Sequence, residues 1–247
     1  MTSYFDPGDG RRIAYAQRPA GDPARPTLVF LPGYASDMAG TKALAVDAFA
    51  AATGCGCLRL DYSGTGESAG KFEDGTLARW LEELLAAIDR ITEGRLILVG
   101  SSMGGWLTLH AALRRSERIA ALVGIAVAPD FTDWGFSSGD KIALLQAGKL
   151  ERPNPYGPDP WVIHRAFWQS GEALRLLHAP IAIDCPVRLI HGDQDGEVPV
   201  GVPLKLLAQL RSPDVQLGLI KGGGHRLSEP HEIEAILRAL APLVEKV

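Results

Sequence analysis

Short apolar runs alternate along the chain with longer segments in which apolar residues recur every three or four positions. The short runs are too brief for helices and predict buried strands at 27–31, 55–60, 95–99, 121–127, 187–190 and 215–220. The periodic segments predict helices at 41–52, 77–91, 103–113, 204–210 and 233–244. A turn at 6–10 adds an opening hairpin. Strand–helix alternation of this kind predicts an α/β fold with a mostly parallel sheet covered by helices on both faces.

One long stretch, residues 130–180, interrupts this rhythm between two predicted strands. Connections in such folds usually take about 2–6 residues, so this stretch is an insertion. It holds seven of the 17 aromatic residues of the chain, which are Phe131, Trp134, Phe136, Tyr156, Trp161, Phe167 and Trp168. We therefore expect a single domain over 1–247 with a cap at about 130–180 above one end of the sheet. Extra helices packed at the side are the alternative.

Composition and charge narrow the range of partners. The 247 residues suit one α/β domain, and a net charge of −4 without a basic stripe argues against nucleic acid as a partner. The longest apolar run, 119–128, is far short of the roughly 20 residues of a membrane span. The N-terminus has neither a secretory nor a transit pattern, so we expect a soluble, cytoplasmic protein. Cys55, Cys57 and Cys185 are expected to be reduced, the first two as small buried residues rather than metal ligands.

A candidate nucleophile lies where the third core strand gives way to a helix. Residues 100–104 read Gly-Ser-Ser-Met-Gly, which matches G-x-S-x-G in its strand–turn–helix context. The glycines allow close backbone approach, and the sharp turn exposes the hydroxyl of Ser102. The helix start beneath it favours developing negative charge. This pattern predicts the nucleophile elbow of an α/β-hydrolase.

The partners of the serine follow in the order that this fold requires, acid and then histidine. The loop after the strand at 187–190 carries Asp193 and Asp195, and the loop after 215–220 carries three glycines and His225. We predict His225 as general base and Asp195, in Asp-x-x-Val-Pro, as the acid. Asp193 is the competing acid, otherwise a turn-former. His191 precedes the acid and is expected to be structural.

The reaction also needs donors for the oxyanion. The backbone N–H groups of Met103 and Tyr34 are the candidates, because Met103 follows the nucleophile and Tyr34 follows the first core strand. Among the cap aromatics we select Trp134 and Trp168 as substrate-binding residues. No metal or organic cofactor is expected, because a Ser-His-Asp triad needs none.

Four stretches resemble one group within this superfamily: 31–45 (LPGYASDMAGTKALA), 59–68 (RLDYSGTGES), 99–107 (VGSSMGGWL) and 185–192 (CPVRLIHG). They are similar to a group within the abhydrolase-domain family, numbered as its tenth member. This group comprises the mitochondrial palmitoyl-protein thioesterases, also called acyl-glucuronide esterases. The resemblance runs from about Thr27 to the end and is weakest at 131–173. It implies the same nucleophile, acid and base. Without a transit peptide, the chain is expected to be a bacterial relative.

The leading functional hypothesis is a serine hydrolase that cleaves carboxylic esters or acyl thioesters through an acyl-serine intermediate. Its substrates would be small molecules or acyl proteins, with acyl groups on protein thiols or glucuronides included by the resemblance. A peptidase or an acyltransferase of the same fold, or a non-catalytic binding protein, are the alternatives. The peptidase would need an anionic anchor for a substrate amine, and the acidic residues of the cap show no cluster. The oligomeric state is left open by the sequence.

Overall fold

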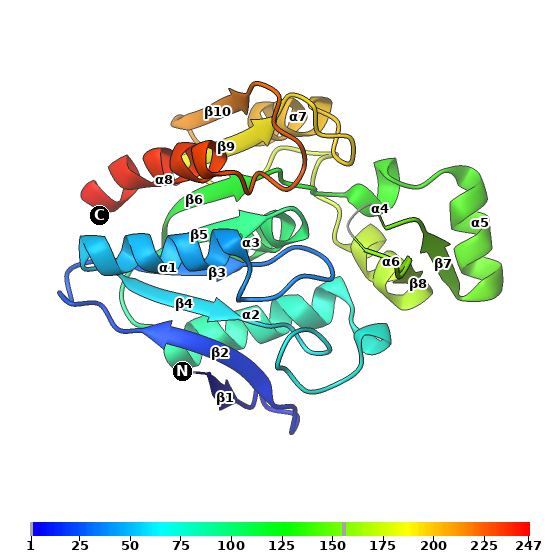
Figure 1. The fold of residues 1–247 in the computed structure, drawn as a ribbon, viewed down its shortest axis with the longest axis horizontal. Helices are drawn as coiled ribbons and strands as arrows, with labels where there is room; N and C mark the ends of the chain where they lie inside the picture. The colour runs from blue at the N-terminus through cyan, green and yellow to red at the C-terminus, as the bar shows by residue number, and fades with distance from the viewer. Residues whose placement is uncertain (1, 155–156) are drawn as a thin grey trace.

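The computed structural model describes residues 2–154 and 157–247, and in this part of the chain the main sheet has eight strands (Figure 1). Their spatial order is β1-β2-β4-β3-β5-β6-β9-β10. The first two strands pair antiparallel, as do β2 and β4, and all other neighbours are parallel. The strands are β1 (Ser3–Phe5), β2 (Ile13–Arg18), β3 (Thr27–Leu31), β4 (Gly56–Leu60), β5 (Leu96–Ser101), β6 (Ile119–Ile125), β9 (Val187–Gly192) and β10 (Val215–Ile220). The predicted α/β architecture is confirmed.

Helices cover both faces of this sheet. One face carries α1 (Thr41–Thr53) and α8 (Pro230–Glu245), and the other carries α2 (Leu77–Ile91), α3 (Met103–Arg114) and α7 (Gly201–Gln209). The strands β5 and β6 are buried on both faces, which explains why they read as unbroken apolar runs. Two cores result, one on each side of the sheet.

The helix α3 lies at the centre of one of these cores. Its residues from Met103 to Ala112 are all buried, because the sheet lies on one side and α2 on the other. This accounts for the near absence of charge in its sequence. The helix α2 is instead amphipathic and begins at Thr76, whose side chain accepts the Arg79 N–H at 3.1 Å.

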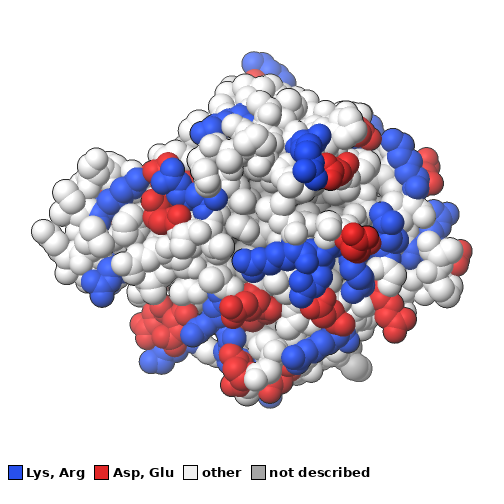
Figure 2. Space-filling view, turned by 180° about the vertical axis from the view of Figure 1, so that it is seen from behind, with Lys and Arg blue, Asp and Glu red and all other residues white. Residues whose placement is uncertain are grey.

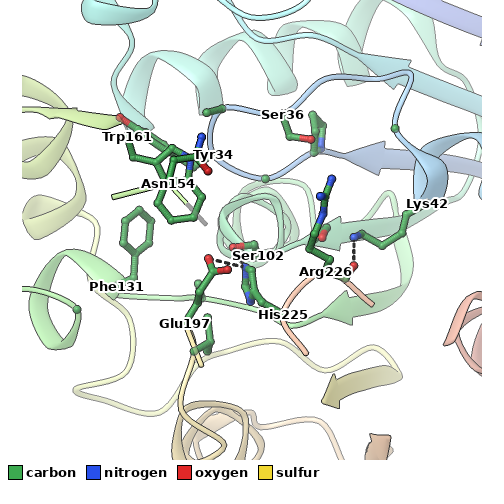
Figure 3. Close-up of a pocket in the computed structure, with 18 of the residues that line it drawn as sticks. Tyr34, Ser36, Lys42, Ser102, Phe131, Asn154, Trp161, Glu197, His225 and Arg226 are labelled. Carbon is green, nitrogen blue, oxygen red and sulfur yellow. Dashed lines mark hydrogen bonds and ion pairs between the residues drawn. The ribbon is translucent and has the colours of Figure 1, made fainter. Parts of the chain in front are cut away.

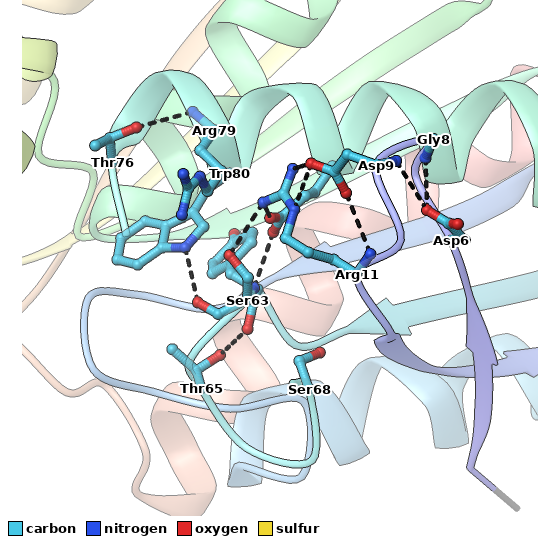
Figure 4. Close-up of polar contacts among 12 residues, drawn as sticks. Asp6, Gly8, Asp9, Arg11, Ser63, Thr65, Ser68, Thr76, Arg79 and Trp80 are labelled. Carbon is cyan, nitrogen blue, oxygen red and sulfur yellow. Dashed lines mark hydrogen bonds and ion pairs between the residues drawn. The ribbon is translucent and has the colours of Figure 1, made fainter. Parts of the chain in front are cut away.

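A polar network fastens the N-terminal hairpin to α2 and to the loop after β4 (Figure 4). The Arg11 guanidinium pairs with the buried carboxylate of Glu83, whose second oxygen accepts the Ser63 N–H at 2.9 Å. Burial raises the pKa of Glu83, while the bonds from Ser63 and the charge of Arg11 oppose that rise. The Trp80 indole donates to the Ser63 carbonyl at 3.1 Å. The loop after β4 is thus held at several points.

The elements between β6 and β9 lie together on one side, beyond the carboxyl ends of the parallel strands (Figure 1). They are α4 (Phe131–Trp134), α5 (Ser138–Ala147), β7 (Lys149–Arg152), β8 (Trp161–His164) and α6 (Arg165–Ala173). We keep the name cap for residues 130–180. Asp130 joins the two ends of this segment, because its carboxylate oxygens accept the Leu176 N–H at 2.8 Å and the Leu177 N–H at 2.7 Å.

The cap packs on the body through aromatic rings. The ring of Tyr34, from the loop after β3, lies 4.8 Å from that of Phe167 in α6 and 5.0 Å from that of Phe72, between centroids. Phe72 belongs to a short 3₁₀ helix, Phe72–Asp74, and both rings also contact Trp80 of α2. Aromatic pairs of this kind contribute about 0.5–1.5 kcal/mol each beyond the area that they bury.

The surface and the cysteines add two findings. On the face seen from behind, Lys and Arg side chains are interspersed with Asp and Glu rather than gathered by sign (Figure 2). Cys55 and Cys57 are buried free thiols, and Cys185 is a free, partly buried one. Within residues 2–154 and 157–247, no helix is long and apolar enough to cross a membrane, and no group of His, Cys, Asp and Glu could hold a metal ion.

Candidate active site

The backbone bends sharply at Ser102, between β5 and α3. Its φ of 52° and ψ of −117° are unfavourable for a residue with a side chain, and such strain costs on the order of 1–3 kcal/mol. The flanking glycines permit the bend. A Cβ on Gly100 would lie 2.5 Å from the Gly104 carbonyl oxygen, and one on Gly104 would lie 2.2 Å from that of Leu31. The motif therefore presents the hydroxyl at the carboxyl edge of the sheet.

The structure brings the three predicted triad residues together from three separate loops. His225 Nε2 lies 3.0 Å from Ser102 Oγ (Figure 3). His225 Nδ1 lies 2.8 Å from Asp195 Oδ2. These residues follow β5, β9 and β10, whose parallel alignment puts all three loops at one edge of the sheet. The result is a continuous hydrogen-bonded chain from carboxylate to hydroxyl.

Asp195 is held rigidly and is almost fully enclosed. Its side chain is 1% exposed, and Oδ1 accepts the Glu197 and Val198 N–H groups, each at 2.9 Å. Burial alone would raise the pKa of Asp195, but the bond and charge of His225 and the two amides outweigh it and leave the pKa below its usual value. The carboxylate is therefore ionised at neutral pH and oriented toward the histidine.

The competing acid has a different set of partners. Asp193 accepts the Gly222 N–H at 2.6 Å and pairs with Lys221 at 3.0 Å. It joins the two loops that carry the acid and the base, and it does not contact His225. His191 is buried behind the acid, with Nε2 2.9 Å from the Val198 carbonyl oxygen, and it lies 3.5 Å from Asp195. Its place at the strand end fits a structural histidine.

The loop after β9 and the loop that carries His225 are in close backbone contact. A Cβ on Gly192, at the end of β9, would lie 2.1 Å from the Gly223 carbonyl oxygen. The Gln194 N–H also donates to that carbonyl at 3.0 Å. The absence of a side chain at Gly192 therefore lets the two loops touch, in an arrangement in which His225 is bonded to Ser102.

The loop after β3, which carries the second oxyanion candidate, passes directly beside the nucleophile. A Cβ on Gly33 would lie 3.4 Å from Ser102 Cβ. The buried Asp61 holds this loop, because its carboxylate accepts the Met38 N–H at 2.7 Å. Tyr34 also reaches the cap, where its hydroxyl donates to the Val162 carbonyl at 2.8 Å. The placement of the Tyr34 and Met103 backbones beside Ser102 suits their proposed role.

A cavity of about 760 Å³ opens above Ser102 and His225. On its cap side the wall is mostly apolar and aromatic, and the lining residues there include Phe131, Trp134, Phe136, Trp161 and Ile163. Of the two predicted substrate-binding tryptophans, Trp134 lines the cavity. Trp168 is not among the residues that line it; its indole donates to the Thr132 carbonyl at 3.0 Å and its ring packs against the core. A direct contact of Trp168 with substrate stays a prediction that this placement does not support.

Sequence reasoning missed a second carboxylate beside the base. Glu197 Oε2 lies 3.8 Å from His225 Nε2, and Glu197 lines the cavity (Figure 3). Its position two residues after Asp195 in the same loop was the available signal. Glu197 therefore places a second carboxylate in the cavity wall next to His225.

Comparison with known proteins identifies related sequences. A family model described as alpha/beta hydrolase family matches residues 28–238. The chain is 36% identical over 249 residues to the mitochondrial palmitoyl-protein thioesterase ABHD10 of Homo sapiens, covering 99% of this chain and 80% of that protein. It is 28% identical to a monoacylglycerol lipase of Mycolicibacterium smegmatis, over 92% of this chain and 91% of that protein.

Among solved structures, alpha/beta hydrolase domain-containing protein 10 from mouse superposes with a TM-score of 0.91 at 36% identity, covering 100% of this chain and 99% of that chain. The resemblance read from the four sequence stretches is therefore confirmed. The chain belongs to the alpha/beta hydrolase family.

Proposed function

We propose that this protein is a serine hydrolase that cleaves carboxylic esters or acyl thioesters through an acyl-enzyme intermediate on Ser102. The observation that carries the proposal is the hydrogen-bonded chain from Asp195 through His225 to Ser102, set at the base of a cavity whose cap side is mostly apolar and aromatic. The thioesterase and lipase activities named for the relatives agree with it. Small molecules or acyl proteins are its expected substrates, and the cytoplasm its expected location.

In the first half of the reaction, Ser102 Oγ attacks the acyl carbonyl while His225 Nε2 takes the hydroxyl proton. The oxyanion that forms accepts hydrogen bonds from the Met103 and Tyr34 amides. Asp195 stabilises the imidazolium and fixes its orientation through Nδ1. The imidazolium then protonates the departing alkoxide or thiolate. In the second half, a water molecule attacks the acyl-enzyme carbonyl while His225 takes its proton. The carboxylic acid is then released and the Ser102 hydroxyl is restored.

The cavity supports an apolar acyl chain as the part of the substrate beneath the cap. Aromatic side chains bury about 150–250 Å² each, so the five apolar cap residues named above can enclose a medium chain. Each buried CH₂ contributes about 0.8 kcal/mol, so kcat/KM should rise about fourfold per methylene until the cavity is full.

The experiment has two parts. A fluorophosphonate probe should label the wild-type protein and leave Ser102→Ala unlabelled, with circular dichroism showing that both are folded. Rates for 4-nitrophenyl esters and acyl thioesters from acetyl to dodecanoyl then test the chain-length trend. Labelling that persists in Ser102→Ala would contradict the assignment of Ser102 as nucleophile. A preference for acetyl groups, or cleavage of amides alone, would contradict the proposed substrate class.

A further inference from the structure

Two cationic side chains line the cavity on the side away from the cap aromatics. They are Lys42 and Arg226, and they lie across Ser102 and His225 from Phe131, Tyr34 and Trp161 (Figure 3). Arg152, another cation among the lining residues, belongs to the cap and pairs there with Asp140 at 2.9 Å. Lys42 and Arg226 form a cationic part away from the cap, with Ser102 and His225 between it and the aromatic part. The proton transfers described so far make no use of either cation.

The two cations come together from distant parts of the chain. Lys42 is the second residue of α1, and Arg226 directly follows His225 in the loop after β10. The Lys42 ammonium donates a hydrogen bond to the Arg226 backbone carbonyl. This bond occupies one of its three protons and fixes the ammonium at the cavity wall, beside the residue that follows the base.

The wall of the cavity also carries two carboxylates, Asp37 and Glu197. Glu197 lies on the Phe131 side of Ser102, away from Lys42 and Arg226 (Figure 3). Burial and, to a smaller extent, the charge of Arg226 lower the pKa of Lys42 to about 8, while Glu232 acts in the opposite direction. Glu232 is itself bonded to the Glu229 N–H at 2.8 Å. Asp37, a carboxylate on the cavity wall, accepts the Ala39 N–H at 2.8 Å within its own turn. Lys42 is bonded to a carbonyl rather than to either carboxylate.

The chemistry of the triad decides which part of a substrate meets these cations. The imidazolium of His225 donates its Nε2 proton to the leaving group, so the leaving group must lie next to Nε2. Arg226 is the next residue in the chain, and Lys42 is bonded to its carbonyl. The acyl chain occupies the opposite, aromatic side beneath the cap. The cationic side is therefore the place of the leaving group.

We propose that Lys42 and Arg226 form a leaving-group subsite that selects esters and thioesters whose alcohol or thiol carries a carboxylate or a phosphate. The inference rests on the proposed hydrolase activity, for which it specifies that the leaving group is an anion. Ammonium and guanidinium groups bind both kinds of anion through charge-assisted hydrogen bonds.

The test compares matched octanoyl thioesters that differ only in leaving-group charge. One pair uses 3-mercaptopropionate against 3-mercaptopropionamide, and a second uses 4′-phosphopantetheine against pantetheine. The measured quantity is the ratio of kcat/KM for the anionic member to that for the neutral member, taken for wild type, Lys42→Met and Arg226→Gln. Lys71→Met is the matched control, because its side chain is 75% exposed and does not line the cavity.

Each cavity substitution should lower the ratio about fivefold, as expected for the loss of one solvent-exposed ion pair, and leave the neutral substrate nearly unaffected. If the ratio falls only for the carboxylate pair or only for the phosphate pair, that result identifies which anion the subsite binds. Ratios that match those of wild type and Lys71→Met in both pairs would overturn the subsite. Failure of wild type to cleave even the neutral thioesters would instead overturn the proposed hydrolase function.

The pH dependence supplies a second readout. Above pH 8 Lys42 loses its proton, so the preference for the anionic member should fall between pH 7 and pH 9.5 in wild type. In Lys42→Arg the charge persists over this range, and the preference should be nearly constant. A preference that declines equally in both proteins would show that Lys42 does not carry it.

Discussion

Asp195→Asn should nearly abolish turnover while leaving the fold intact, and the structure gives the reason. The oxygen Oδ1 accepts two backbone N–H groups, from Glu197 and Val198. An asparagine must keep its carbonyl oxygen there, since its NH₂ group would face two donors. The NH₂ is thereby forced into the position of Oδ2, 2.8 Å from His225 Nδ1.

A donor at that position reverses the tautomer of the imidazole. Nδ1 becomes the acceptor, Nε2 carries the hydrogen, and Nε2 can no longer take the proton of the Ser102 hydroxyl 3.0 Å away. A wrong tautomer of this kind lowers kcat by about 10⁴ in a Ser-His-Asp enzyme, which corresponds to about 5.5 kcal/mol in the barrier.

The assay is kcat for 4-nitrophenyl octanoate, with circular dichroism and thermal unfolding as checks on the fold. Asp193→Asn is the matched control, because it makes the same chemical change in the same loop at a residue bonded to Lys221 and Gly222 instead. It should retain most of the activity. Equal losses in the two variants, or a larger loss in Asp193→Asn, would refute the assignment of Asp195 as the acid.

Three further predictions concern the triad and the cap. Ser102→Ala and His225→Ala should each lower kcat by about 10⁶, and the double variant should be little worse because the residues act as one unit; additive losses in single-turnover kinetics would contradict this. Trp134→Ala should flatten the rise of kcat/KM with acyl-chain length more than it slows acetyl esters, and an unchanged slope would place the chain elsewhere. Asp130→Asn should lower the free energy of unfolding in urea by about 1–3 kcal/mol, because its NH₂ group would face a backbone N–H such as that of Leu177. A variant as stable as wild type would show that this clamp contributes little.

The core of the fold was predictable from the sequence because it depends on local periodicity. Six apolar runs became strands, with ends displaced by at most two residues where hydrogen bonding continued into the next turn, as at Ser101 and Gly192. The convergence of Ser102, Asp195 and His225 was predictable because the fold imposes an order on such residues and each follows a strand.

The sequence predicted the position of the cap in the chain but not its internal structure. Its centre is rich in Pro and Gly, which gave no periodic signal, yet β7 and β8 form an antiparallel pair there. Which aromatic residue faces the cavity depends on how the cap helices pack, so Trp134 was found in the wall and Trp168 was not. Lys42 and Arg226 are 184 positions apart, and only tertiary packing brings them to one cavity.

The dual contact of Tyr34 limits how freely the cap of this protein can be exchanged for that of a relative. Its backbone lies beside the nucleophile, its hydroxyl is bonded to Val162 of the cap, and its ring packs on Phe167. A transplanted cap without a backbone carbonyl at the position of that of Val162 would release the loop that carries the proposed oxyanion donor. Grafts of this segment should therefore alter the rate of the chemical step together with substrate preference. Substrate specificity cannot be changed through the cap of this protein without also affecting catalysis.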